Sequence, residues 1–400
     1  MAHSPPHRIG LYLAVVQFFF TITWTVYVIF LPKLAVQAGI PKHAVLYILL
    51  ADQIIFVVMD MAMGVMADRV SRTLGRLGYV ILGVTLVSCL AFLLLPIAAP
   101  EGAWLFLLLI ALWAASSSAL RAPPLMLLGK YAAQPQVPWL SALSLFGLGV
   151  AGAIGPYLTI VLRDMDPRLP FALSSVALGL TTAGIIWAER ALAGSATAPA
   201  ETPKATPPKP AQPMFWFFFA VLLAGLGFQI HFALNSAPLY LRYAKAADLQ
   251  YLMPVFWIGF SVLMLPASLA TKRYGGLAVT GVGALVAALA TVGAYMAGDL
   301  KTIVAMQLIA GGGWGCVLMS AVAAALAIGH TGREGKLTGG LFALLAVAAF
   351  SRIAIIAAEL NKDPQFASLL TWTPVAAWAL GGLILLLLLP AQRKLMSSPG

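Results

Sequence analysis

The sequence predicts an all-α polytopic membrane protein, and three observations lead to that fold class. Of the 400 residues, 61% are apolar and only 9% are charged, and the mean hydropathy of +0.94 lies far above that of soluble domains. Runs of about eighteen or more nearly uncharged residues recur along the chain, and about 20 helical residues cross a hydrocarbon core of about 30 Å. These runs lack the alternating polarity of membrane-barrel strands.

Twelve segments are long and apolar enough to span the membrane. We expect them at residues 9–31, 44–67, 77–98, 103–128, 138–161, 169–188, 214–236, 250–271, 276–297, 302–329, 337–359 and 367–390. The tenth segment contains the run Gly-Gly-Gly-Trp-Gly at 311–315. Adjacent glycines favour either a bend or a close helix contact at that point.

A stretch rich in Pro, Ala and Thr separates the sixth segment from the seventh. Its sequence, ALAGSATAPAETPKATPPKPAQP, predicts an extended linker rather than part of a core. We therefore expect an N-terminal six-helix half at 1–190, a cytoplasmic linker at 191–213 and a C-terminal six-helix half at 214–400. Six helices on either side of a long linker indicate two structurally repeated halves.

The distribution of Lys and Arg predicts that both termini are cytoplasmic. With the N-terminus inside, the inner segments hold fourteen of the 24 basic residues and the outer loops hold eight. The net charge of +11 then reflects topology and contact with membrane lipid, so we expect no nucleic-acid partner. The compact loops are typical of a bacterial inner-membrane protein, and we expect a monomer. The two cysteines lie in apolar segments and imply no disulfide framework.

Charge is concentrated at the predicted cytoplasmic end of the second helix. The stretch from Gly64 to Arg76 reads GVMADRVSRTLGR. Gly64 lets another helix approach closely, and Asp68 can accept hydrogen bonds from the N-terminus of another helix. Arginines 69 and 72 would anchor the loop at the inner surface.

This stretch resembles the loop motif of the major facilitator superfamily, roughly G-x-x-x-D-R-x-G-R-[RK]. The matching residues are Gly64, Asp68, Arg69 and Arg72, whereas Ser71 stands at the usual glycine and Thr73 at the last basic position. The resemblance implies that the motif holds the two halves together on the cytoplasmic side, against helix 11, and stabilises the outward-facing state. Ordinary arginines of a cytoplasmic loop are the alternative interpretation.

The second half carries a weaker counterpart between its second and third helices. In the stretch ASLATKRYGGL at 267–277, Thr271 occupies the place of Asp68 and is followed by Lys272 and Arg273. The basic pair remains, but the acid is missing.

A second motif lies in the predicted fifth helix, in the stretch GLGVAGAIGPY. Glycines permit tight helix contacts and proline introduces a kink, and the residues concerned are Gly147, Gly149, Gly152, Gly155 and Pro156. The pattern resembles the antiporter motif of the same superfamily, which is commoner in exporters, although Thr159 and Ile160 replace its trailing glycine pair. The alternative is a glycine-rich packing face with no bearing on direction.

Asp52, Asp60, Arg121 and Arg352 lie well inside predicted helices, where charge is costly and therefore indicates function. At about 1.5 Å per residue, Asp52 on helix 2 and Arg352 on helix 11 both lie about 10–12 Å below the outer surface. In the superfamily these helices face each other. We expect either an Asp52–Arg352 pair that closes the extracellular side or two groups that face water in a cavity. Asp60 and Arg121 lie deeper; they could pair, or Asp60 could carry a coupling proton.

The resemblance also implies a central cavity lined by helices 1, 4, 7 and 10. The candidate lining residues on these helices are Gln17, Trp24, Tyr27, Gln229, His231, Asn235 and Trp314. A single histidine such as His231 could titrate near neutral pH, or it could make one structural hydrogen bond.

The chain has no nucleotide-binding glycine loop, no closely spaced Cys/His cluster and no nucleophile–base pair. We therefore expect no enzyme activity, no cofactor and no metal. The sequence favours proton-coupled export (antiport) of a small organic compound by rocking of the two halves. The alternative is proton-coupled uptake (symport) of a sugar or organic anion, and an arginine in the cavity would favour an anion. A receptor or scaffold is disfavoured because no sizeable soluble domain is present.

Overall fold

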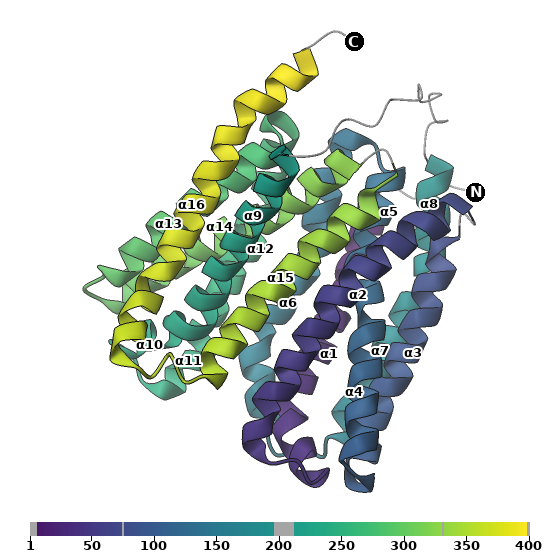
Figure 1. Ribbon diagram of the computed structural model, residues 1–400, viewed down its shortest axis with the longest axis vertical. Helices are drawn as coiled ribbons and strands as arrows, with labels where there is room; N and C mark the ends of the chain where they lie inside the picture. Colours follow the sequence, from purple (N-terminus) through teal and green to yellow (C-terminus); the bar gives the residue numbers. More distant parts are fainter. Residues whose placement is uncertain (1–5, 74–75, 196–211, 330–331, 398–400) are drawn as a thin grey trace.

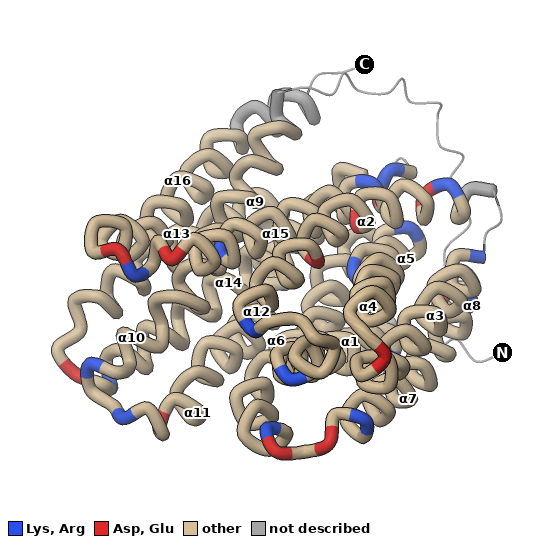
Figure 2. Tube along the Cα trace, turned by 60° about the horizontal axis from the view of Figure 1, so that its bottom comes forward, with Lys and Arg blue, Asp and Glu red and all other residues tan. Residues whose placement is uncertain are grey.

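The computed structural model describes residues 6–73, 76–195, 212–329 and 332–397. All regular secondary structure in these ranges is helical, and twelve helical spans there are long and apolar enough to cross a membrane. These twelve correspond one to one with the predicted segments, most extended by a few residues at their ends. Most charged residues lie in loops and at helix ends (Figure 2).

Each half of the molecule contains six of the spans (Figure 1). The N-terminal half contains α1 (Pro6–Gln37), α2 (Val45–Thr73), α3 (Leu77–Ala98), α4 (Ala103–Ser117), α5 (Pro123–Tyr131), α6 (Val137–Leu162), α7 (Arg168–Ala183) and α8 (Ile185–Ser195). The C-terminal half contains α9 (Gln212–Ile230), α10 (Ser236–Leu241), α11 (Leu249–Leu252), α12 (Pro254–Tyr274), α13 (Gly276–Tyr295), α14 (Leu300–Gly329), α15 (Glu334–Ala357) and α16 (Pro364–Ser397). Of the predicted linker 191–213, residues 191–195 belong to α8, residues 212–213 belong to α9, and residues 196–211 lie outside the described ranges.

Four spans consist of two helices joined by a short irregular turn. The pairs are α4 with α5, α7 with α8, α9 with α10, and α11 with α12. Pro123 and Pro254 each occupy the first position of the second helix, where the missing N–H costs least. Between α9 and α10 the chain makes a π-helical turn at His231–Asn235, and short 3₁₀ turns occur at Lys42–Ala44, Ala99–Glu101, Ser118–Leu120, Gln134–Gln136 and Ala246–Asp248.

The glycine run at 311–315 packs closely and does not interrupt its helix. Helix α14 continues without a break from Leu300 to Gly329. A Cβ at Gly311 would collide with the carbonyl of Phe256, and a Cβ at Gly315 with the carbonyl of Phe260. These glycines therefore let α14 lie directly against the backbone of α12.

Two long helix pairs join the halves: α2 packs along α15, and α6 packs along α12. Helix α1 begins and α16 ends at the same end of the bundle, called the terminal end below (Figure 1). The α2–α15 contact at that end is backbone against backbone, because a Cβ at Gly64 would collide with the Gly335 carbonyl and a Cβ at Gly339 with the Asp60 carbonyl. This contact brings the two halves together beside the central cavity.

Candidate functional site

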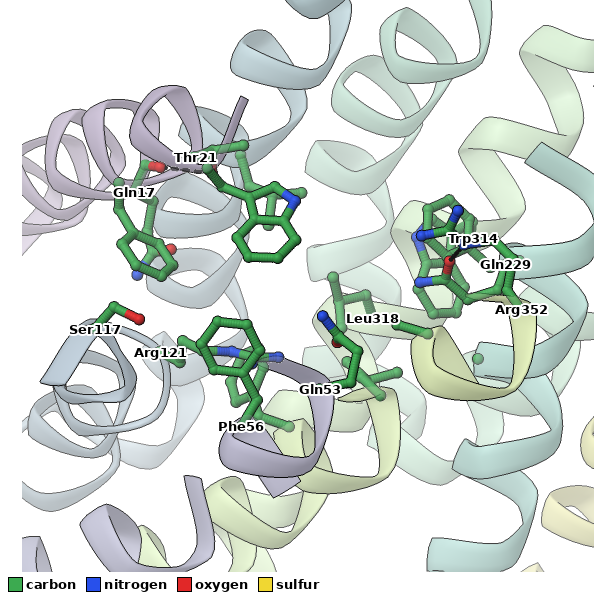
Figure 3. Close-up of a pocket in the computed structure, with 18 of the residues that line it drawn as sticks. Gln17, Thr21, Gln53, Phe56, Ser117, Arg121, Gln229, Trp314, Leu318 and Arg352 are labelled. Atoms are coloured by element: carbon green, nitrogen blue, oxygen red, sulfur yellow. Dashed lines mark hydrogen bonds between the residues drawn. The ribbon is translucent and has the colours of Figure 1, made fainter. Parts of the chain in front are cut away.

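A cavity of about 270 Å³ lies between the two halves. Its wall combines residues of α1, α2, α4 and α6 with residues of α9, α12, α14 and α15 (Figure 3). Eight of the 20 lining residues are aromatic: Phe20, Trp24, Phe56, Trp113, Phe228, Trp257, Trp314 and Phe342. Polar groups are few, so the cavity has the composition of a site for a small organic molecule.

Four of the seven residues expected in the cavity line it. Gln17 and Trp24 come from α1, Gln229 comes from α9 and Trp314 comes from α14. The Nε2 of Gln17 donates to the carbonyl of Leu120 at 2.8 Å, which orients the amide. The ring of Trp314 stacks on Phe228 with centroids 4.6 Å apart and 2° between their planes.

The other three expected residues, Tyr27, His231 and Asn235, lie away from the cavity, which corrects the prediction. The hydroxyl of Tyr27 donates to Asp52 at 2.7 Å within the N-terminal half. The fully buried His231 contacts the Oε1 of Gln307 through its Nε2 at 3.0 Å. Asn235 donates to the hydroxyl of Tyr295 at 2.9 Å and to the carbonyl of Leu370. Each residue lies on the predicted helix but faces a neighbour in its own half.

Arg121 and Asp60 form an ion pair with 3.0 Å between Nη1 and Oδ2. The carboxylate is fully buried, while the guanidinium lines the cavity. The guanidinium carbon lies 4.8 Å from the ring centroid of Phe56 and 5.5 Å from that of Phe342, which belongs to the opposite half. Arg121 follows the turn at Ser118–Leu120 and precedes the prolines of α5, so the break in this span places its side chain beside the cavity.

The expected outer pair, Asp52 and Arg352, is not formed in this structure. Asp52 is fully buried and bonds to Tyr27, whereas the Nε of Arg352 donates to the Oε1 of Gln229 at 2.9 Å. The direction in which Asp52 points around helix α2 accounts for the missing pair. Asp60 contacts α15. At about 100° per residue, the residue seven positions before Asp60 lies on the same face of α2, whereas Asp52, eight positions before it, is turned away from that face by about 80°.

The residue seven positions before Asp60 is Gln53, and Gln53 lines the cavity. Gln53 was not among the predicted lining residues, although the helical period counted back from Gly64 identifies its face of α2. Phe228 and Phe342 were missed as well, because one aromatic residue among many in an apolar helix carries no distinguishing signal.

Asp68 at the terminal end of α2 caps the first turn of α15. Its Oδ1 accepts the N–H of Gly335 at 2.7 Å, and its Oδ2 accepts the N–H of Lys336 at 2.8 Å. The side chain is 4% exposed. Arg69 is exposed, and the side chain of Arg72 lies outside the described residues. A carboxylate at this place satisfies two free N–H groups of α15 and interacts favourably with the helix dipole.

The glycines of α6 serve close packing against both halves. A Cβ at Gly147 would collide with the carbonyl of Ala14 on α1, and one at Gly149 would collide with the side chain of Ser261 on α12. A Cβ at Gly152 would lie 2.5 Å from the ring of Trp257. A Cβ at Gly155 would approach Thr25 only to 3.9 Å, and Pro156 does not end α6, which continues to Leu162.

The counterpart position in the second half makes its bonds inside that half. The hydroxyl of Thr271 lies 2.8 Å from that of Ser320 on α14 and donates to the carbonyl of Ala267. Thr271 therefore joins α12 to α14, whereas Asp68 joins the two halves.

Comparison with known proteins agrees with this architecture. A family model described as Major Facilitator Superfamily matches residues 13–351. The human organic anion transporter MFSD10 (TETRAN) superposes with a TM-score of 0.69 at 12% identity, covering 96% of this chain and 100% of that chain. A bacterial homologue of the iron transporter ferroportin in an outward-facing state has a TM-score of 0.69 at 13% identity, covering 94% of this chain and 98% of its own.

The E. coli fucose:proton symporter FucP has a TM-score of 0.63 at 13% identity, covering 94% of this chain and 97% of its own. Identities this low show a shared fold and no more. No curated protein sequence is significantly similar to this chain.

Proposed function

The chain belongs to the major facilitator superfamily, a family of transporters, and from that premise we propose that it exports a small organic solute in exchange for protons. The observation that carries this proposal is the cavity between the halves, whose wall draws on both of them. A solute bound there contacts both halves at once. Rocking of one half against the other would then change the side from which the solute is reached.

The terminal end is the cytoplasmic end in this proposal, and the protein lies in a bacterial inner membrane as a monomer. The contact between α2 and α15 closes that end, and the two hydrogen bonds of Asp68 must break when it opens. The conformation described here is then the outward-facing one. Loss of these bonds accompanies each passage to the inward-facing conformation.

Export is favoured by the glycines of α6, which resemble the antiporter motif and hold this helix against α1 and α12. For the proton we propose Asp60, a buried carboxylate with Arg121 as its ion-pair partner beside the cavity. Asp60 can exchange Arg121 for a proton, and Arg121 can exchange Asp60 for a solute. Because the Asp60 carbonyl lies at the α2–α15 contact, such an exchange would couple the cavity to that contact.

Uptake of an organic anion by symport is the second candidate. Arg352 favours it, because this arginine lines the cavity and its nearest polar partner is the neutral amide of Gln229. The charge of the solute does not decide its direction, so both candidates remain compatible with this residue.

Proton movement in liposomes distinguishes the candidates. Purified protein is reconstituted with a pH-sensitive dye inside, and antibiotics, sugars and organic acids are added on one side. Proton movement opposite to the solute is expected for export, and movement in the same direction would establish uptake instead. Absence of proton movement with a solute that is transported would refute proton coupling.

The role of Asp60 is tested separately with Asp60→Asn and with the double variant Asp60→Asn/Arg121→Gln, which leaves no unpaired charge. Transport by a folded variant that retains the pH dependence of the wild type would exclude Asp60 as the proton carrier.

A further inference from the structure

The two arginines of the cavity have different partners. Arg121 is paired with Asp60 at 3.0 Å. Arg352 donates its Nε to Gln229, and no carboxylate of the described residues forms an ion pair with it. No Asp or Glu is among the residues that line the cavity. The cavity therefore carries one positive charge that the described protein does not neutralise.

A cation inside the membrane without a counter-ion is costly. The Nη groups of Arg352 make no hydrogen bond with the described residues, which leaves four of its five N–H donors available. A carboxylate or another planar anion accepts two parallel hydrogen bonds from such a group. A bound anion would neutralise the site and satisfy these donors at the same time.

An aromatic surface lines the same cavity as this charge. Phe228 precedes Gln229 in the chain, and its ring lies parallel to that of Trp314 at 4.6 Å. Trp314, Gln229 and Arg352 all line this cavity (Figure 3), and Arg352 is hydrogen-bonded to Gln229. Aromatic walls also suit organic cations, but the uncompensated guanidinium repels them. A sugar would leave both the charge and the broad apolar wall without a matching partner.

We propose that the solute is a small organic anion with an aromatic ring, whose charged group binds Arg352 and Gln229 and whose ring packs against Trp314 and Phe228. The cavity volume of about 270 Å³ lies near the lower end of ligand sites, which span about 300–1,000 Å³, and limits the solute to a small molecule. The assignment rests on the proposed function only in placing the solute in the central cavity. Direction and proton coupling do not enter it.

Three probes with the same naphthalene ring test the charge preference: 2-naphthoate, 2-naphthamide and protonated 2-(aminomethyl)naphthalene. Binding to the purified full chain is measured by thermal stabilisation in detergent over a concentration series. The naphthoate is expected to bind at least tenfold more tightly than the amide, because roughly one charge-assisted hydrogen bond contributes the free energy that corresponds to this factor. The amine is expected to bind most weakly.

Variants of the site test whether Arg352 causes the preference for the anionic probe. Arg352→Gln should abolish the preference for naphthoate over naphthamide, and Arg352→Lys should retain part of it because the charge remains but the planar fork is lost. Trp314→Leu should weaken all three probes by similar factors. Lys42→Gln, which removes one exposed charge outside the cavity, is the matched control and should change nothing.

Three results would overturn the assignment: equal or tighter binding of the amide or the amine, an unchanged anion preference in folded Arg352→Gln, or no naphthoate binding at millimolar concentration by folded wild type. Failure of the proposed function looks different. Selective naphthoate binding without proton-coupled transport in liposomes refutes proton-coupled export alone. Proton-coupled transport of only neutral or cationic compounds refutes the anion assignment and retains the transporter.

Discussion

Two buried carboxylates at the terminal end cap helices in the same manner, but one joins the two halves and the other does not. Asp68 on α2 accepts the N–H groups of Gly335 and Lys336 at the start of α15, in the opposite half. Glu189 on α8 accepts the N–H groups of Leu77 and Gly78 at the start of α3, in its own half, at 2.9 and 2.7 Å.

The local geometry of the two contacts is closely matched. Asp68 is 4% exposed and Glu189 is 5% exposed. Each carboxylate meets a glycine, because a Cβ at Gly335 would lie 2.8 Å from Asp68 and a Cβ at Gly78 would lie 2.9 Å from Glu189. The chemistry of the contact therefore does not distinguish them.

Their position in the fold gives them different roles. In the proposed rocking mechanism, hydrogen bonds between the halves exist only while the terminal end is closed, so their free energy contributes to the equilibrium between closed and open conformations. Hydrogen bonds inside one half persist through rigid-body rocking, so their free energy contributes to folding stability. Substitutions at these contacts should therefore differ in their effect on the contact between the halves.

Gly64→Ala should have the largest effect. The added Cβ would collide with the Gly335 carbonyl, and backbone atoms cannot move aside as the end of a flexible side chain can. We expect α2 and α15 to separate and the closed conformation to be lost. Transport should fall by more than tenfold, because a shift of roughly 1.4 kcal/mol toward the open conformation already changes the closed-to-open ratio by that factor.

The contact is measured by cross-linking Met61→Cys to Gly340→Cys in a Cys89→Ser/Cys316→Ser background. The Met61 Cε lies 3.3 Å from the Cβ position of Gly340, so a short bifunctional thiol reagent spans the pair. Gly78→Ala is the matched control: it should lower the unfolding temperature and leave cross-linking unchanged. Normal cross-linking in Gly64→Ala would show that the close approach is not required.

Asp68→Asn should have the next largest effect. The amide keeps one acceptor but turns a donor toward the second N–H, so at least one charge-assisted hydrogen bond to α15 is lost. The closed conformation should become about 1.5–3 kcal/mol less stable relative to the open one, which lowers the closed-to-open ratio roughly ten- to hundredfold. Cross-linking of the same cysteine pair should fall while the unfolding temperature changes little. A large drop in unfolding temperature with unchanged cross-linking would assign Asp68 a folding role instead.

Glu189→Gln should show the opposite pattern. The substitution removes the same kind of bond from the first turn of α3, so the unfolding free energy should decrease by about 1.5–3 kcal/mol. Denaturant titration in detergent measures this loss. Cross-linking between α2 and α15 should stay at the wild-type level, and a decrease there would mean that α3 takes part in the movement of the halves.

The sequence predicts in which span a residue lies, but not in which direction its side chain points. The twelve spans follow from composition and length alone, and the residues Gly64 and Asp68 follow from a pattern confined to thirteen positions. The span in which a residue lies is also predictable, since Asp52 and Arg352 lie in the spans expected for them. Whether two residues meet depends in addition on the direction in which each helix face points.

Direction could have been partly derived from the helical period. Gln229 faces the cavity, and His231 is two positions later, about 200° around a regular helix, so both could not line the same wall. Asn235 could not be placed in this way, because it ends a π-helical turn that changes the number of residues per turn. That turn has no recognisable signal in the sequence.

Thr271→Val should have the smallest effect on the contact between the halves. Thr271 occupies the place of Asp68 in the second half, but its hydroxyl bonds to Ser320 and Ala267 in that same half. Valine has nearly the same shape and leaves the buried Ser320 hydroxyl with one partner fewer, so the unfolding free energy should fall by about 0.5–1.5 kcal/mol. Cross-linking between α2 and α15 should be unaffected. A shift comparable to that of Asp68→Asn would show that both repeats control the terminal end, whereas the expected result assigns this control to the acid of the first half alone.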